Sequence, residues 1–158
     1  MSGQHTYRAR CTWQGSTAVG YREYQREHVV AAPPARDALT LSADPAFLGQ
    51  PERLNPEQLV VMAAASCQLL SFLAVAARAR VDVLGYEDDA VGVMPEDDRP
   101  IRLTRIVLQP RIVVALGPTA EEVRHLVDVA HHECYIANSL RTEVSVQPQV
   151  EFSPPPKN

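Results

Sequence analysis

The chain has 158 residues and a formal net charge of −4, with 46% hydrophobic and 22% charged residues. This composition is typical of one soluble globular domain and excludes a chain that is disordered throughout. Lys and Arg are scattered along the sequence, so we expect no nucleic-acid partner. Three cysteines are too few for a disulfide-stapled secreted scaffold. The first residues lack the apolar core of a signal peptide, and we therefore expect a cytoplasmic protein.

The first half of the chain predicts three short strands and one long helix. Alternating polar and apolar residues predict strands over 5–14, 21–31 and 38–42. Asn55, Pro56 and Glu57 then form a helix start signal, with an N-cap, a proline at the first helical position and an acid in the first turn. The apolar run behind this signal contains neither glycine nor proline. It therefore predicts a helix that continues to about Arg80.

The second half of the chain predicts further strands around a second helix. The predicted strands cover 81–94, 101–116 and 142–152. Thr119 and Glu122 form a capping box, which opens a helix reaching about Leu140. This order of elements predicts an α+β fold in a single domain over 1–152. The proline-rich tail over 153–158 has no means of packing, and we expect it to be disordered.

The first helix is apolar on all sides over residues 59–77, where only Ser66, Gln68 and Ser71 are clearly polar. Its length nearly meets that of a membrane span, ~20 residues. Gln68 at its middle and its many weakly apolar alanines argue against a membrane. A soluble protein must cover such a helix on every side. The few predicted elements of one chain cannot do this, so we expect a homodimer whose sheets enclose the helix.

The second helix has one apolar stripe, and a cysteine lies on it. The stripe consists of Val123, Leu126, Val127, Ala130, Cys134 and Ala137. Cys67 lies inside the first helix, so both helices carry a cysteine toward the core. The plain interpretation is that cysteines are small buried hydrophobes. Cys11, in a strand without acid–base neighbours, keeps this interpretation.

Metal and cofactor sites are not expected. His125, His131, His132 and Cys134 lie close together in sequence. However, adjacent histidines on a helix project ~100° apart, and the spacings of zinc ligands are absent. The sequence also has no glycine-rich phosphate loop. We therefore expect a protein without metal or cofactor.

Two segments carry a resemblance to a known family. The first is Asn55-Pro56-Glu57-Gln58-Leu59, followed ten positions after Glu57 by Cys67. The second runs from Ala130 through Cys134 to Ser139, with Ala-His before the cysteine and Asn shortly behind it. Both resemble the OsmC/Ohr family of osmotically inducible and organic hydroperoxide resistance proteins, over residues 5–152. The segments 24–28 and 42–47 resemble an OsmC-like subgroup within it.

The resemblance implies a fold and an activity. The implied fold has two long central helices enclosed by β-sheets in an intertwined homodimer. The implied activity is that of a cysteine-based peroxidase, which reduces organic hydroperoxides in oxidative stress and is restored by an external dithiol. Cys67 matches the attacking thiol and Cys134 the resolving thiol, which would join in a disulfide.

A cation is needed beside Cys67, because the cysteine lies well inside its helix in apolar surroundings that disfavour a thiolate. The resemblance implies an arginine from the early strands, held by the glutamate that Glu57 matches. We favour Arg26, with Arg22 as second choice. The alternative for either arginine is a solvent-exposed strand charge.

The spacing of Glu57 and Cys67 adds a constraint. Residues ten apart lie ~15 Å from each other along a straight helix. Both therefore cannot contact one arginine within one unbroken helix. Either the helix bends sharply, or the glutamate near a given Cys67 comes from the partner chain, which is the arrangement we expect.

The lining of the site suggests its substrate. An apolar lining from Met62, Leu69, Leu70 and Phe72 would suit an alkyl hydroperoxide better than hydrogen peroxide. Two other functions stay open: a non-catalytic module that binds a lipid or another small molecule, and a thiol redox sensor. Tyr135 keeps them open, because it replaces the proline usual after the second cysteine in the hydroperoxide resistance branch.

Overall fold

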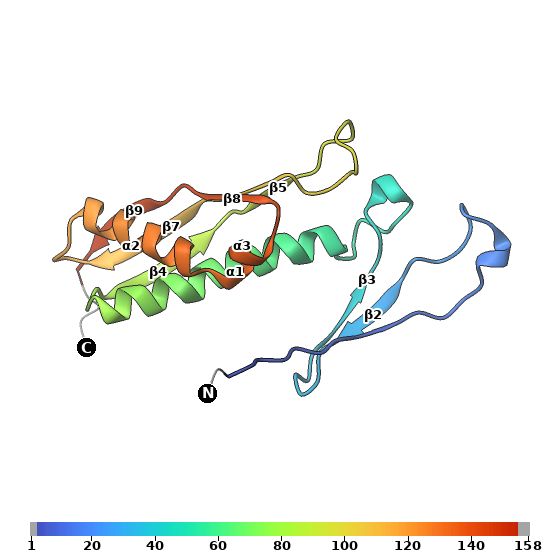
Figure 1. Ribbon diagram of the computed structural model, residues 1–158, viewed down its shortest axis with the longest axis horizontal. Coiled ribbons are helices and arrows are strands. Elements are labelled where there is room, and N and C mark those ends of the chain that lie inside the picture. Colours follow the sequence, from blue (N-terminus) through green and yellow to red (C-terminus); the bar gives the residue numbers. More distant parts are fainter. Residues whose placement is uncertain (1–2, 155–158) are drawn as a thin grey trace. The chain divides into compact units, whose positions relative to one another are not determined.

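The structure, a computed structural model, describes residues 3–154 (Figure 1). It divides into two compact units, unit 1 over residues 1–59 and unit 2 over residues 60–158. Helix α1 (Pro56–Arg78) begins in the first unit and continues in the second. Ser153, which we expected in the tail, is the last residue of strand β9. Residues 155–158 of that tail lie outside the described residues.

Unit 1 contains an antiparallel sheet of three strands in the order β1-β2-β3. The strands are β1 (Arg10–Thr12), β2 (His28–Ala31) and β3 (Ala38–Leu41). A 3₁₀ turn, η1 (Thr17–Val19), lies between β1 and β2, and a second, η2 (Pro45–Phe47), follows β3. The strands predicted over 5–14 and 21–31 are therefore too long. Carbonyl groups between β1 and β2 accept hydrogen bonds from the side chains of Trp13 and Arg26 rather than from a neighbouring strand.

The start of α1 follows the sequence prediction. The side chain of Asn55 accepts a hydrogen bond from the backbone of Gln58 (2.8 Å), and the side chain of Gln58 accepts one from the backbone of Asn55 (3.0 Å). This reciprocal pair is a capping arrangement that satisfies two backbone N–H groups. Before it, Gly49 passes so close to the Ala43 carbonyl that a Cβ atom would lie 1.6 Å from its oxygen. Only glycine fits there.

Unit 2 contains two three-stranded sheets. One has the order β4-β7-β9, from Val83–Asp88, Pro110–Ala115 and Gln149–Ser153. The other has the order β5-β6-β8, from Val91–Val93, Arg105–Leu108 and Glu143–Val146. In each sheet the first pair of strands is antiparallel and the second is parallel. Each long strand predicted from the sequence is thus two strands, one in each sheet.

Hydrogen bonds connect the residues at one break between strands to those at another. The Asp88 carboxylate accepts from the backbone N–H of Gln109 (2.7 Å), and the backbone N–H of Gln147 donates to the carbonyl of Leu108 (2.8 Å). The backbone groups released where one sheet ends are therefore satisfied by the neighbouring breaks.

The second helical segment is interrupted at Cys134. Helix α2 (Ala120–Glu133) opens with the predicted capping box of Thr119 and Glu122, and α3 (Tyr135–Ser139) follows after the break. The prediction of one helix to Leu140 is wrong. The side chain of Asn138 donates to the His132 carbonyl (3.0 Å), so it satisfies a carbonyl that a continued helix would have used.

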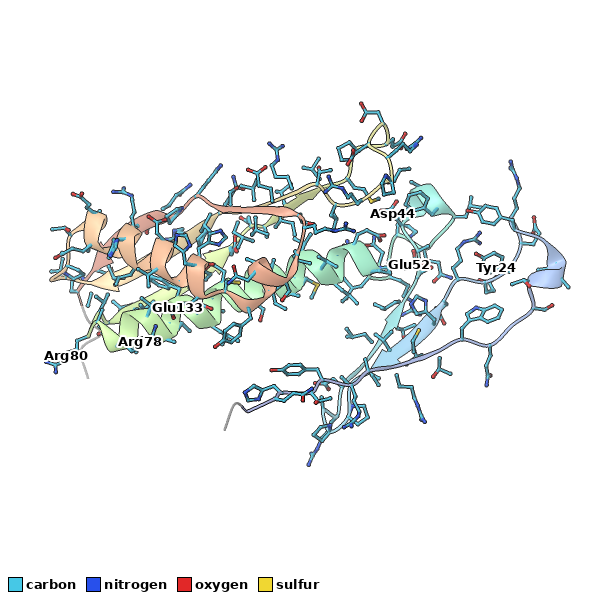
Figure 2. All side chains as sticks on the ribbon, viewed as in Figure 1. Tyr24, Asp44, Glu52, Arg78, Arg80 and Glu133 are labelled. Carbon is cyan, nitrogen blue, oxygen red and sulfur yellow. The ribbon has the colours of Figure 1, made fainter. Side chains whose placement is uncertain are left out.

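Helices α1 and α2 lie side by side in unit 2 (Figure 1). Gln68 donates from Nε2 to the Val127 carbonyl (3.3 Å), and Arg78 forms an ion pair with Glu133 (2.6 Å; Figure 2). The main core lies between these helices and the β4-β7-β9 sheet. Its buried members are Phe72, Val75, Ala76, Ile112, Val114, Val123, Val127 and Ala130.

One side of α1 is not covered by the other elements of unit 2. Met62 is 51% exposed, Leu70 64% and Leu73 39%. By length and composition α1 could cross a membrane, a test that core helices of soluble proteins also pass. The mixed α+β composition is confirmed, whereas the intertwined homodimer with two long enclosed helices stays a prediction.

Candidate functional site

The structure brings Cys67 and Cys134 together in unit 2. Cys67 is half-buried in α1, and Cys134 is fully buried at the break between α2 and α3. The backbone N–H of Ile136, two residues beyond Cys134, donates to the Cys67 sulfur at 3.5 Å. Both cysteines are free thiols. The break in the helix thus turns the amide groups of α3 toward both sulfur atoms.

The surroundings of Cys134 favour its thiol form. Burial raises the pKa of Cys134, and the neighbouring side chain of Cys67 raises it further, while the backbone N–H groups of Ala137 and Ile136 act in the opposite direction. This leaves a buried thiol, whose ionisation is disfavoured, beside a half-buried one.

A second cluster of interest lies in unit 1, around a cavity of about 450 Å³. Two of the predicted site residues, Arg26 and Glu57, line this cavity, whereas Arg22 is exposed and is not among its lining residues. Of the two arginines, Arg26 is thus the one that lies at this cavity. The other lining residues are Trp13, Thr17, Tyr21, Tyr24, His28, Ser42, Ala43, Asp44, Phe47 and Pro56.

Arg26 is held by the two tyrosines that precede it. Its Nη1 donates to the Tyr24 carbonyl (2.9 Å) and its Nη2 to the Tyr21 carbonyl (2.6 Å). Its Cζ lies 4.0 Å from the centre of the Tyr24 ring and 5.0 Å from that of Tyr21. Two N–H groups are therefore bound, and within residues 3–154 the others have no hydrogen-bond partner and can serve a ligand. Figure 2 shows Tyr24 in this part of the chain.

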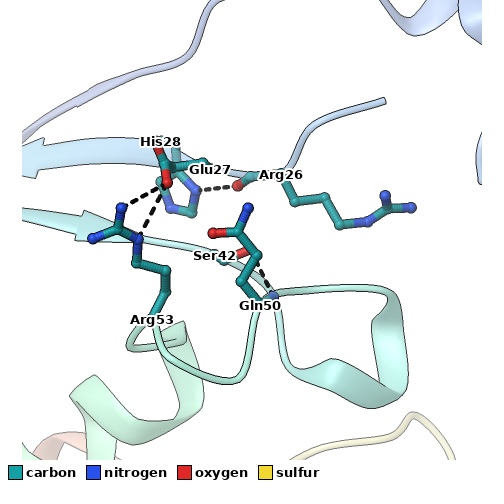
Figure 3. A network of polar contacts seen from close by, with 6 residues as sticks. All are labelled: Arg26, Glu27, His28, Ser42, Gln50 and Arg53. Atoms are coloured by element: carbon teal, nitrogen blue, oxygen red, sulfur yellow. Dashed lines mark hydrogen bonds and ion pairs between the residues drawn. The ribbon is translucent and has the colours of Figure 1, made fainter. Parts of the chain in front are cut away.

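A polar network anchors the segment that carries Arg26, just before β2. The Nδ1–H of His28 donates to the Arg26 carbonyl (2.9 Å), and Glu27 forms an ion pair with Arg53 (3.0 Å). Figure 3 shows the Arg26 side chain directed away from this ion pair. Ser42 completes the network by accepting a hydrogen bond from the backbone of Gln50 (3.2 Å).

Glu57 does not hold Arg26 in this structure. Among the described residues, the contacts of the Arg26 guanidinium are those with Tyr21 and Tyr24, and none is an ion pair with Glu57. Sequence reasoning missed both tyrosines. The spacing of an arginine two and five residues after tyrosines was visible, but nothing in the local sequence predicted that the side chain would fold back onto the preceding turn.

The four apolar residues predicted to bind substrate do not form one lining within the chain. Phe72 is fully buried in the core, with its ring centre 5.9 Å from that of Tyr86, so it is a core residue and not an accessible one. Met62 and Leu70 are exposed and Leu69 is half-buried. At ~100° per residue, Leu70 and Phe72 lie on nearly opposite sides of the helix.

Cys11 also differs from the prediction. We expected a buried structural cysteine, but Cys11 is exposed on β1, an edge strand of its sheet. Alternation alone does not tell a covered strand from an uncovered one.

Comparison with known proteins identifies relatives. The family model described as OsmC-like protein matches residues 49–149. An OsmC-like protein of unknown function from Vibrio cholerae is 29% identical, with a TM-score of 0.84 over 92% of this chain and 100% of that chain. No curated protein sequence matches.

Two solved structures of lower identity share the fold. One is an organic hydroperoxide resistance protein OsmC from Legionella pneumophila, 21% identical, with a TM-score of 0.69 over 95% of this chain and 99% of that chain. The other is an organic hydroperoxide resistance protein from Elizabethkingia anophelis, 19% identical, with a TM-score of 0.73 over 97% and 100%.

Proposed function

The chain belongs to the OsmC-like protein family, and from this premise we propose that it is a cysteine-based peroxidase that reduces organic hydroperoxides at the expense of an external dithiol. The observation that carries the proposal is the contact of the Cys67 sulfur with the Ile136 amide, beside the buried thiol of Cys134. An attacking thiol and a resolving thiol must be neighbours for their sulfur atoms to join.

The proposed reaction has three balanced steps. The Cys67 thiolate attacks the terminal oxygen of the hydroperoxide, an S–O bond forms as the O–O bond breaks, and the alkoxide leaves as an alcohol after taking a proton. The Cys134 sulfur then attacks the Cys67 sulfenic acid, so that a disulfide forms and water leaves. The external dithiol reduces this disulfide by thiol–disulfide exchange and is itself oxidised to a disulfide.

The surroundings of the two thiols support these roles. Cys134 is fully buried and its pKa is raised, so its own direct reaction with peroxide is disfavoured. Cys67 is the more accessible of the two, and the Ile136 N–H offers a hydrogen bond to a charged sulfur at this position.

In our proposal, Arg26 and Glu57 complete the site from a second chain. Glu57 and Cys67 belong to one unbroken helix, along which residues ten apart are separated by ~15 Å. A homodimer would allow Arg26 of one chain to polarise the peroxide that Cys67 of the other attacks, with Glu57 beside it. The uncovered apolar side of α1 supports a homodimer.

Turnover assays test the proposed activity. Reduced protein with dithiothreitol should consume cumene hydroperoxide faster than hydrogen peroxide, and Cys67→Ser should abolish this consumption. Cys11→Ser is the matched control, because Cys11 is an exposed cysteine outside the pair. Tight binding of apolar ligands without any oxidation would favour the binding module, and rapid oxidation without turnover would favour the sensor.

A mixed dimer tests the shared site. Chains carrying Glu57→Ala are combined with chains carrying Cys67→Ser, and each parent dimer is expected to be inactive or nearly so. Restoration of one active site per mixed dimer supports the contribution of Glu57 from the partner chain. An inactive mixed dimer contradicts it.

A further inference from the structure

The cavity of unit 1 has an aromatic wall, although aromatic residues make up only 6% of the chain. The rings of Trp13 and Tyr24 are 6.4 Å apart and those of Tyr21 and Tyr24 are 6.2 Å apart, both edge to face. Trp13 is fixed by a hydrogen bond from its Nε1 to the Gln25 carbonyl (2.7 Å). Phe47 adds a fourth ring. The wall is thus built before any ligand arrives.

The charged groups in the cavity define the polar part of a ligand. Arg26 offers free N–H donors, and Glu57 supplies a carboxylate that accepts hydrogen bonds. Asp44 is already engaged, because it accepts from the Ala46 backbone (2.8 Å) and from the Asn55 side chain (3.3 Å). An anion would meet two carboxylates and a cation would meet Arg26. A neutral group with one donor and one acceptor oxygen suits the cavity best.

We propose that this cavity binds the organic group of the hydroperoxide and that its aromatic wall selects aryl-alkyl hydroperoxides over linear alkyl ones. The inference rests on the proposed function and adds the substrate class. A hydroperoxide is neutral and carries both a donor and an acceptor oxygen, and a cavity of about 450 Å³ lies within the usual range for small organic ligands. Stacking against aromatic rings then distinguishes a phenyl group from an alkyl chain.

The test measures binding without reaction. The Cys67→Ser protein is titrated with 2-phenyl-2-propanol, the alcohol from cumene hydroperoxide, and with 2-methyl-2-octanol, a tertiary alcohol of the same carbon number. Trp13 is the only tryptophan of the chain and lines the cavity, so its fluorescence reports on occupancy. The phenyl alcohol should bind between about two- and tenfold more tightly than the octanol derivative. Calorimetry gives a second measurement of both affinities.

Variants of the wall test its role. Tyr21→Leu and Phe47→Leu alter partly exposed rings, and each should abolish most of the preference for the phenyl alcohol. Tyr7→Leu is the control, because Tyr7 is 90% exposed and is not among the lining residues. Circular dichroism verifies that each variant is folded.

Three results would overturn the inference: equal affinity for the two alcohols, tighter binding of the linear one, or an unchanged preference in both wall variants. Because the titration needs no Cys67 thiol, its failure would leave the peroxidase assays standing. Conversely, a failed peroxidase assay would leave this binding result standing.

Discussion

The guanidinium of Arg26 lies over the ring of Tyr24, with Cζ 4.0 Å from the ring centre, while its Nη1 donates to the carbonyl of the same residue at 2.9 Å. One residue thus orients the arginine with both its backbone and its side chain. A second ring and carbonyl, those of Tyr21, also contact the guanidinium, with Cζ 5.0 Å from the ring centre and Nη2 2.6 Å from the carbonyl oxygen. The arginine is preorganised before a substrate binds, which is what electrostatic stabilisation of a leaving oxygen requires.

Replacing Tyr24 tests this orientation. Tyr24→Leu removes the closer ring but keeps the carbonyl, so kcat/KM for cumene hydroperoxide should fall by about fivefold, the equivalent of one partly buried cation–π contact. Tyr24→Phe keeps the ring and should retain the wild-type value. Steady-state kinetics of the three proteins provide the measurement, and a Leu variant as active as wild type would show that the ring does not position Arg26.

The capping box of α2 should contribute measurably to stability. The Thr119 hydroxyl accepts from the Glu122 backbone (3.2 Å), and the Glu122 carboxylate accepts from the Thr119 backbone (2.7 Å). Thr119→Ala should therefore lower the free energy of unfolding by about 1 kcal/mol. Urea denaturation measures this loss, and Thr119→Ser, which keeps the hydroxyl, should restore most of it. Equal stability of the Ala and Ser variants would contradict the prediction.

Tyr86 should make stability depend on pH in the alkaline range. Burial raises the pKa of Tyr86 well above its usual value, with further contributions from Asp88 and Cys134. The unfolded chain ionises this tyrosine above pH ~10 while the folded chain holds the proton. The contribution of protonated Tyr86 to the free energy of unfolding is therefore fully present below pH ~10. It is lost as the pH rises above this value.

Tyr86→Phe removes this titration. Its free energy of unfolding should rise relative to wild type between pH ~9 and ~11. Urea denaturation at several pH values gives the comparison. A difference between the two proteins that is constant over this range would show that Tyr86 does not resist ionisation in the folded state.

The uncovered side of α1 should be a dimer interface. Leu70, on that side, is 64% exposed in the single chain, and a charge there would have to be buried on association. Leu70→Glu should therefore dissociate the dimer, which sedimentation equilibrium detects as halving of the mass. Leu116→Glu is a matched control, because Leu116 is 68% exposed beyond the end of β7 and not on α1. Wild-type protein that sediments as a monomer would refute the interface.

Local signals in the sequence predicted the elements that depend on local contacts. The start of α1 at Asn55 and the capping box at Thr119 were both correct, because each is set by residues three apart. The α+β composition was also correct. The proximity of Cys67 and Cys134 was expected from the family resemblance, and the contact of Cys67 with Ile136 agrees with it.

Features set by distant contacts were not predictable in the same way. The sequence predicted one long strand where the structure has two consecutive ones, because the alternation of polar and apolar residues continues through the breaks. At one such break the Asp88 side chain accepts a hydrogen bond from Gln109, which lies twenty-one residues further along the chain. The helix break at Cys134 is accompanied by a hydrogen bond from the Asn138 side chain to the His132 carbonyl, which helical periodicity does not predict. The contacts of the Arg26 side chain with Tyr21 and Tyr24 depend on a turn of the chain that hydrophobic periodicity does not predict.

The most direct test of the proposed peroxidase is the redox state of its cysteines after exposure to substrate. Reduced protein is mixed with one equivalent of cumene hydroperoxide, and its thiols are blocked and mapped by mass spectrometry. We predict an intrachain disulfide between Cys67 and Cys134 with Cys11 still a thiol, and in Cys134→Ser a sulfenic acid at Cys67 that dimedone traps. Unconsumed peroxide with both Cys67 and Cys134 still reduced would contradict the account.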